Sequence, residues 1–311
     1  MTRIFLCFFL LITVCMAFDA YADENANYEY QIRHDLVDAD LQYGLERVLN
    51  ENPKWRSLIQ QKRMAVGLVD LSNKKIRFGR VNGNAMMYAA SMPKIAILLA
   101  AYQSFEDGSL VETKQIHEDL ENMIRRSNND AATRIIDLIG FKKIAAVLSD
   151  PAFGFYDESK GGGLWVGKRY AKAGKRYGDP MFNISHGATV AQVCRFYYLL
   201  ASNRLINPKR SAQMLQDLSA PGLHHKFVNA IDKLAPDAKL FRKSGTWKNW
   251  HADSIMVKGK RWRNYILVAM VESPDGETII RQILPAVEKV LYKQRKTTLT
   301  NIIEDENANN T

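Results

Sequence analysis

The stretch SMPKIAILLAAYQSF (residues 91–105) is apolar almost throughout, and it constrains the fold more than any other segment. A helix without a polar face has to be buried on all sides, so the chain must build a large core around it. Two polar residues stand at its beginning, Ser91 and, one helical turn later, Lys94. A buried ammonium group is costly unless it is paired. Lys94 therefore either turns out to solvent or acts on Ser91.

The spacing of this serine and lysine suits a catalytic pair, because residues i and i+3 lie on one face of a helix. A serine hydroxyl is a weak nucleophile and needs a base. A lysine in an apolar pocket loses its proton near neutral pH and supplies that base. The simpler alternative is that Ser91 caps the helix, with Pro93 tolerated in the first turn and Lys94 at the surface.

The first 22 residues predict an export signal. A short basic start precedes an apolar run, and Ala20-Tyr21-Ala22 offers a cleavage site. An uncleaved anchor or a lipid on Cys15 are the alternatives. Cleavage leaves Cys194 as the last cysteine, so no intramolecular disulfide is possible. We expect a periplasmic or secreted protein that has no membrane span after signal cleavage and is a monomer.

The formal net charge of the chain is +10, and part of it gathers in GKRYAKAGKRYG (167–178). A basic exported protein favours the anionic cell envelope or anionic substrates. We interpret the basic residues, more simply, as a solvated surface. Nucleic acid is not an expected partner, because no nucleic-acid motif is present and the signal directs the chain out of the cytoplasm.

Strand patterns stand at both ends of the chain, with helical patterns between them. This order predicts an α+β fold, an α/β/α sandwich whose antiparallel sheet is built from N- and C-terminal strands beside an all-helical subdomain. We expect one domain over 23–300 and a disordered polar tail over 301–311. Within the domain, the sheet parts fall at about 40–90 and 235–295, and the helical part at about 91–234. The glycine-rich loop 157–182 is long enough to indicate a function.

Two further motifs carry polar groups that suit catalysis. Ser127 and Asn129 place a hydroxyl and an amide at the start of a helix, and Gly245 lets a ligand approach a late strand closely. Taken singly, capping, turn chemistry and a strand bulge explain these motifs at least as well. The late strand could also bind the carboxylate of a ligand. It carries one ammonium group and two hydroxyls, those of Lys243, Ser244 and Thr246.

The order S-x-x-K, S-x-N and K-S-G resembles the serine β-lactamase and penicillin-binding protein superfamily, class A enzymes included. The resemblance runs from about Leu41 to Leu291. It implies the β-lactamase-like fold and serine acyl transfer without a cofactor or a metal. The paired histidines His224 and His225 lack further ligands at metal-binding spacing.

The resemblance also implies a role for each motif residue. Ser91 would be the acylated nucleophile, Lys94 its base and Ser127 the proton shuttle to the leaving nitrogen. The backbone N–H groups of Ser91 and Trp247 would form the oxyanion hole. The implied substrate-binding residues are Asn129, Lys243, Ser244, Gly245, Thr246 and Trp247.

The chain departs from class A enzymes where they carry an E-x-x-L-N loop, whose glutamate activates the deacylating water. The long loop before the helix near Ala188 contains three acids, Asp157, Glu158 and Asp179, and none stands in that motif. Glu158 is the nearest candidate base, although a solvated loop carboxylate is the simpler interpretation.

These features predict an exported serine hydrolase that forms an acyl-enzyme on Ser91, with β-lactam hydrolysis and a role in β-lactam catabolism as the nearest functional label. Its substrate would be a small-molecule or peptidoglycan-derived acyl compound. One alternative is a peptidoglycan D-Ala-D-Ala peptidase, amidase or esterase with slow or no β-lactam turnover. Another is a non-catalytic envelope-binding protein.

Overall fold

The computed structural model describes residues 37–308 except 74 and 261. The predicted export signal (1–22) and its cleavage site lie outside the described residues, and the compact unit that contains the fold begins at Asp38. Among the described residues, no helix combines the length and apolarity needed to cross a membrane.

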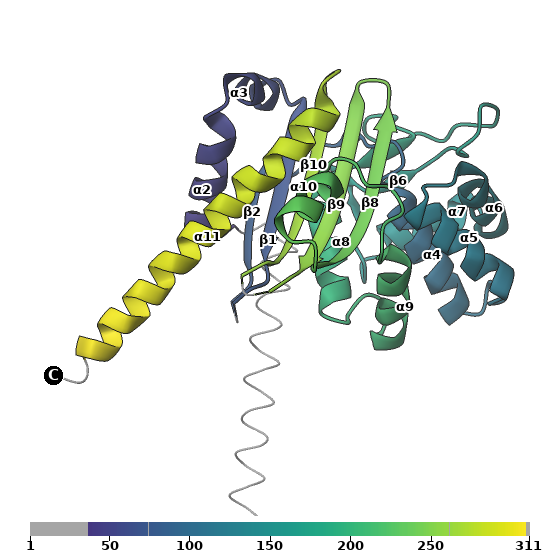
Figure 1. The fold of residues 1–311 in the computed structure, drawn as a ribbon. Coiled ribbons are helices and arrows are strands. Elements are labelled where there is room, and N and C mark those ends of the chain that lie inside the picture. Colours follow the sequence, from purple (N-terminus) through teal and green to yellow (C-terminus); the bar gives the residue numbers. More distant parts are fainter. Residues whose placement is uncertain (1–36, 74, 261, 309–311) are drawn as a thin grey trace, which may run out of the picture. The chain divides into compact units, whose positions relative to one another are not determined.

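A five-stranded antiparallel sheet, in the order β2-β1-β10-β9-β8, joins the N- and C-terminal parts of this unit (Figure 1). The first hairpin and the last three strands of the sequence therefore meet as predicted, and the α+β fold class is confirmed. The strands are β1 (Met64–Asp70), β2 (Arg77–Val81), β8 (Lys239–Trp247), β9 (Trp250–Lys258) and β10 (Asn264–Glu272).

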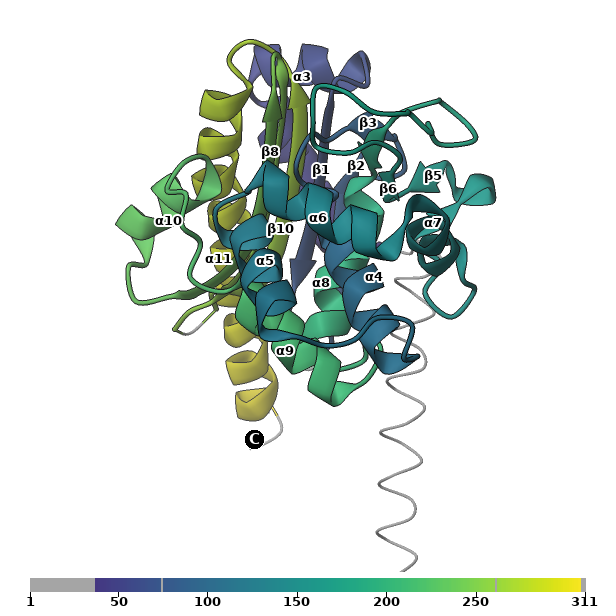
Figure 2. The same ribbon diagram turned by 90° about the vertical axis from the view of Figure 1, so that its right-hand side faces the viewer.

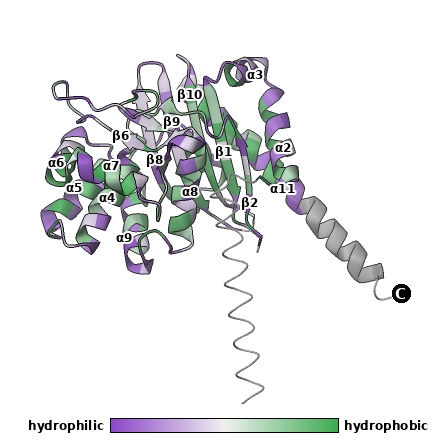
Figure 3. Ribbon diagram, turned by 180° about the vertical axis from the view of Figure 1, so that it is seen from behind, coloured by the Kyte–Doolittle hydropathy of each residue, from purple (hydrophilic) through white to green (hydrophobic). Residues whose placement is uncertain are grey.

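The central strands are apolar on both faces because helices cover both (Figure 3). Val66 and Leu68 belong to the core shared with the first and last helices. Gly67, on the other face, has no room for a Cβ, which would lie 2.7 Å from Cys194 Sγ. One face packs against α2 (Ala39–Asn50), α10 (Phe227–Leu234) and α11 (Gly276–Ala308), and the other against α8 (Val190–Ala201).

The apolar segment 91–105 forms α4 (Lys94–Glu106), in which every residue except Gln103 and Glu106 is buried. The neighbouring helices wrap around it beside the β8 edge of the sheet (Figure 2). They are α5 (Lys114–Arg125), α6 (Asn129–Ile139), α7 (Phe141–Ser149) and α9 (Pro208–Leu218). The remaining helix, α3 (Pro53–Gln60), leads into β1.

The glycine-rich loop after α7 contains only short elements. It pairs with itself and with the segment before α4, and this pairing places the loop over the start of α4. The short elements of this region are β3 (Met87–Tyr88), β4 (Tyr156–Asp157), the 3₁₀ turn η1 (Glu158–Lys160), β5 (Gly162–Gly163), β6 (Trp165–Val166) and β7 (His186–Ala188).

The structure corrects three expectations. Ser91 does not cap α4, because the helix begins after Pro93 and Ser91 lies in the preceding turn. The predicted tail continues α11 as far as Ala308, since no glycine or proline interrupts the chain after Pro285. The segment 91–234 is not purely a helical subdomain, because α8 packs on the sheet.

Candidate active site

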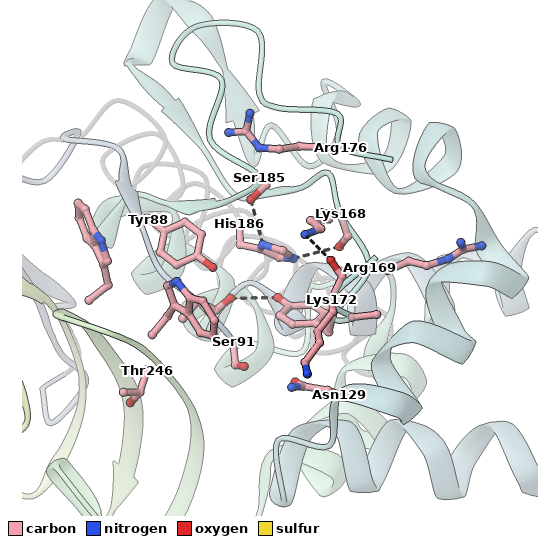
Figure 4. A pocket seen from close by; sticks show the side chains of 15 residues that line it. Tyr88, Ser91, Asn129, Lys168, Arg169, Lys172, Arg176, Ser185, His186 and Thr246 are labelled. Carbon is pink, nitrogen blue, oxygen red and sulfur yellow. Dashed lines mark hydrogen bonds between the residues drawn. The ribbon is translucent and has the colours of Figure 1, made fainter. Parts of the chain in front are cut away.

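A cavity of about 830 Å³ opens where β8, the turn before α4, the start of α6 and the glycine-rich loop meet (Figure 4). All three sequence motifs reach it, although they lie far apart in the chain. Its lining comprises Tyr88, Ala90, Ser91, Asn129, Lys168, Arg169, Tyr170, Ala171, Lys172, Arg176, Ser185, His186, Thr246, Trp247 and Trp250.

Ser91 lies in a turn that is pressed against β8. A Cβ on Gly245 would lie 2.2 Å from the Ala89 carbonyl oxygen and 2.7 Å from the Ser91 nitrogen, so only glycine fits here. The side chain of Ser91 is half-buried, and its hydroxyl makes no hydrogen bond to any described residue. The hydroxyl is therefore free to meet a ligand in the cavity.

Lys94 is fully buried at the first position of α4. Its Nζ donates to the Ser127 carbonyl oxygen at 2.7 Å and to Asn129 Oδ1 at 2.8 Å, and it lies 4.4 Å from the centre of the Tyr170 ring. These partners are neutral, so burial dominates and lowers the pKa of Lys94 to about 7. Part of the population thus carries an unprotonated amine at neutral pH. No hydrogen bond joins this Nζ to Ser91 Oγ in the described structure.

Ser127 connects the two motif lysines. Its hydroxyl lies 2.9 Å from Lys243 Nζ and 3.5 Å from Lys94 Nζ, and its backbone adopts a φ of 57°. Lys243 is almost completely buried, and burial together with the neighbouring Lys94 charge holds its pKa well below the ordinary value. A chain of proton-carrying groups thus runs from one lysine to the other through a serine hydroxyl.

The register of β8 corrects the predicted oxyanion donor. Lys226 Nζ donates to the carbonyl oxygens of both Gly245 and Ala252, which lie close together only when these two residues form a hydrogen-bonded antiparallel pair. Hydrogen-bonded pairs alternate along an antiparallel ladder, so Trp247 and Trp250, two residues further along each strand, also form a hydrogen-bonded pair. The Trp247 N–H is therefore engaged within the hairpin. The intervening N–H, that of Thr246, points to the open edge instead.

Lys226 also orients the side chain of Thr246. Its Nζ donates to Thr246 Oγ1 at 2.8 Å, and burial lowers its pKa only to about 8, so it is mostly protonated at neutral pH. Since an ammonium group only donates, the threonine hydroxyl must direct its own proton elsewhere. Thr246 lines the cavity and offers a ligand this hydroxyl. Ser244, two residues earlier on the same face, is buried and is not among the lining residues.

Tyr170 and His186 form the wall opposite β8, and sequence reasoning assigned neither of them a role. The tyrosine hydroxyl donates to the Ala90 carbonyl oxygen at 3.1 Å, and the two rings lie 4.3 Å apart. His186 Nε2 donates to the Lys168 carbonyl, so Nδ1 accepts from the Ser185 hydroxyl. Burial lowers the pKa of His186 to about 4, which keeps the ring neutral. Their only sequence signal was the aromatic and basic character of the loop.

Glu158 does not reach the site, which corrects the candidate deacylation base. It lies exposed in η1 and is absent from the cavity lining. Asp157 caps the same turn, and buried Asp179 accepts from Tyr156 and from loop backbone N–H groups. Within the described lining there is no carboxylate at all.

The nearby tryptophan and histidine side chains differ in whether they reach the cavity. Trp247 and Trp250 line the cavity, whereas His251 is buried beside Gly276. His224 pairs with Asp232. In the described part of the chain, no cluster of histidine, cysteine or acidic side chains is suited to hold a metal ion.

An antiparallel sheet flanked by helices, with one serine lining a cavity and a second serine joining two buried lysines beside it, defines a serine hydrolase of the β-lactamase type. The chain belongs to the beta-lactamase enzyme family, whose model matches residues 115–294. The matched segment includes Ser127 and Lys243 but begins after Ser91 and Lys94.

Solved structures support the fold. A β-lactamase from Sphaerobacter thermophilus DSM 20745 has a TM-score of 0.57 and 14% identity over 80% of this chain and 95% of its own. A class A β-lactamase representative from Bacteroides cellulosilyticus DSM 14838 has a TM-score of 0.60 and 14% identity over 81% of this chain and 98% of its own. The L158E mutant of PBP-A, solved as an acyl-enzyme complex with penicillin G, has a TM-score of 0.58 and 17% identity over 81% of this chain and 96% of its own. None of the curated proteins matches the chain by sequence.

Proposed function

We propose that this protein is an exported serine acyl-transfer enzyme that is acylated on Ser91 by penicillins and related amides, and that releases the acyl group slowly. The observation that carries the proposal is Lys94, a fully buried lysine with a pKa of about 7 that contacts Ser127 and Asn129. A non-catalytic protein has no physical need to bury this charge among neutral partners.

The proposed acylation balances in protons. Ser91 Oγ attacks the carbonyl carbon while its proton passes to the unprotonated Lys94, and the developing oxyanion accepts from the N–H groups of Ser91 and Thr246. When the carbon–nitrogen bond breaks, the Ser127 hydroxyl donates its proton to the leaving nitrogen. Lys94 then returns to Ser127 the proton that it took from Ser91, and Lys243 also contacts this hydroxyl. In the described structure Lys94 Nζ makes no hydrogen bond to Ser91 Oγ. That bond would form when substrate binds, because catalytic hydrogen bonds often tighten only in the complex.

Slow release follows from the composition of the cavity. Hydrolysis of the acyl-enzyme requires a base that activates water, and the described lining offers no carboxylate for this step. The ring of Tyr170 covers Lys94 on the loop side, and His186 already uses both ring nitrogens. This supports a penicillin-binding or peptidase-like enzyme over a rapid β-lactamase.

Intact-protein mass spectrometry of the mature chain, followed over time with penicillin G and a cephalosporin, tests this function. Penicillin G is the first probe because it acylates the PBP-A variant described above. We expect an adduct that forms and persists, that is absent from Ser91→Ala, and that is unchanged in Ser57→Ala, an exposed serine on α3.

Each other outcome has a clear meaning. An adduct that appears and then clears as product is released would mean a working β-lactamase and would contradict slow release. Labelling of Ser91 by a fluorophosphonate but by neither β-lactam would mean a different acyl substrate. Undiminished labelling of Ser91→Ala would overturn the mechanism.

The proposal of export depends on residues 1–22, where a basic start, an apolar run and Ala20-Tyr21-Ala22 follow one another. The mass of the protein recovered from expressing cells tests it. A chain that starts at Asp23 in the periplasm or medium supports export, whereas a full-length membrane-bound chain would indicate an uncleaved anchor.

A further inference from the structure

One wall of the cavity is strongly basic. Lys168, Arg169, Lys172 and Arg176 all line it, and all four come from the glycine-rich loop. The sequence alone favoured a solvated surface for this cluster, but the pairing of β6 with β7 turns the loop over Ser91 (Figure 4). The wall is therefore part of the site.

The charges on this wall are poorly compensated. Arg169 pairs with Asp137, but the other three cations have no carboxylate partner among the described residues. Arg176 donates to the amide and carbonyl oxygens of Asn183, and Lys168 Nζ lies 3.4 Å from the carbonyl oxygen of Lys172. A cavity that holds several cations and no carboxylate has a positive potential that attracts anions.

The basic wall lies across Ser91 from the predicted carboxylate site. Figure 4 shows Thr246 on one side of Ser91 and Lys168 and Lys172 on the other, with Lys172 extending toward Asn129. An acyl donor that places its leaving-group carboxylate near Thr246 therefore directs its acyl side chain toward the loop.

We propose that Lys168, Lys172 and Arg176 form an anion-binding subsite for the acyl side of the substrate. The favoured acyl donors would carry a second negative group, on the carbonyl side of the bond that breaks. This inference rests on the proposed function, because it takes acylation to occur from this cavity.

Three penicillins that differ in one side-chain group test the subsite. Carbenicillin adds a carboxylate to the side chain of penicillin G, and ampicillin adds an ammonium group at the same carbon. We expect carbenicillin to acylate Ser91 about tenfold faster than penicillin G, and ampicillin to react more slowly, because each contact is with a partly exposed cation. The difference should shrink at high salt.

Matched variants assign the preference to the wall. Lys168→Gln/Lys172→Gln should reduce the carbenicillin-to-penicillin G rate ratio toward one. The control Lys142→Gln/Lys175→Gln removes the same charge from exposed lysines outside the lining, one on α7 and one in the same loop, and should keep the ratio. Thermal melts confirm that both variants fold.

A binding measurement separates this inference from the proposed function. In the Ser91→Ala chain, fluorescence of Trp247 and Trp250, which line the cavity, reports binding without acylation. Tighter binding of carbenicillin, lost in the double variant, would support the subsite even if the wild-type chain were never acylated. Equal binding and equal acylation rates for the three penicillins would overturn the subsite and leave the acylation mechanism intact.

Discussion

At the scale of the residue, Lys94 is the side chain on which the chemistry depends. Its Nζ is satisfied by carbonyl and amide oxygens from Ser127, Asn128 and Asn129, so the protonated form has hydrogen bonds but no counter-charge. Burial therefore decides its pKa, which falls from 10.5 to about 7. The fold accepts the cost of a buried ammonium group and gains an amine that accepts protons at neutral pH.

We predict that Lys94→Met slows acylation by orders of magnitude yet stabilises the fold. Loss of the base should slow labelling by penicillin G about 10²–10⁴-fold. Methionine fills a similar volume without a charge, so the free energy of unfolding should rise by about 1–4 kcal/mol at about pH 6. Mass-spectrometric labelling and thermal or urea unfolding measure the two effects.

The pH dependence of that gain provides the control. Below pH 7 the lysine is charged in both the folded and unfolded chains, and the full cost of burial is present. Above pH 7 the folded chain releases the proton while the unfolded chain keeps it, so wild-type stability rises toward the unfolded pKa near 10.4. The advantage of Lys94→Met should shrink as the pH rises toward about 9. A constant advantage would mean that Lys94 stays charged in the fold up to about pH 9, so that burial does not lower its pKa.

At the scale of the element, the edge strand β8 presses on the turn that carries Ser91. Ser91 N would lie 2.7 Å from a Cβ at position 245, and the Ala89 carbonyl oxygen would lie 2.2 Å from it. Both obstacles are backbone, so they cannot yield as a flexible side chain would. The same contact brings the open Thr246 N–H close to the nucleophile turn.

Gly245→Ala should therefore damage acylation more than folding. We expect at least about a hundredfold slower labelling, because a shift of 1 Å in the reacting groups has that effect. The control is Gly79→Ala on β2, the opposite edge strand, where the nearest atom is 3.4 Å away. Similar labelling rates in the two variants would show that β8 does not hold the serine in place.

At the scale of the whole molecule, periodicity predicted the sheet and most helices because their apolar patterns are long. It missed α3, it missed α10, whose eight residues follow a lysine with a φ of 55°, and it missed the two-residue strands of the loop. Order and spacing predicted the motif residues, including Ser127 and Lys243, which a 2.9 Å contact joins. Elements as short as α10 and the two-residue strands carry too few residues for a period to be visible.

Other parts of the site required three-dimensional information. The choice between the N–H groups of Thr246 and Trp247 depends on strand register, which changes with a shift of one residue. Glu158 was the nearest acid in sequence, but a 3₁₀ turn leaves it exposed. The basic loop was identified as functional by its length, yet only pairing through β6 and β7 turns its cations into the cavity.

The positive character of the cavity as a whole leads to a last prediction. Lys94 and Lys243 meet at Ser127, so their protons are released as a coupled pair, and desolvation lowers both pKa values. For the free enzyme, the second-order rate of acylation by penicillin G should therefore rise with pH, with a limb near pH 7. A bound substrate carboxylate stabilises the protonated lysines, so the limb of the rate at saturating penicillin should lie at higher pH. Acylation rates measured across pH at low and at saturating penicillin give both limbs. A flat profile would exclude Lys94 as the base, and a saturating limb at lower pH would mean that the carboxylate binds away from these lysines.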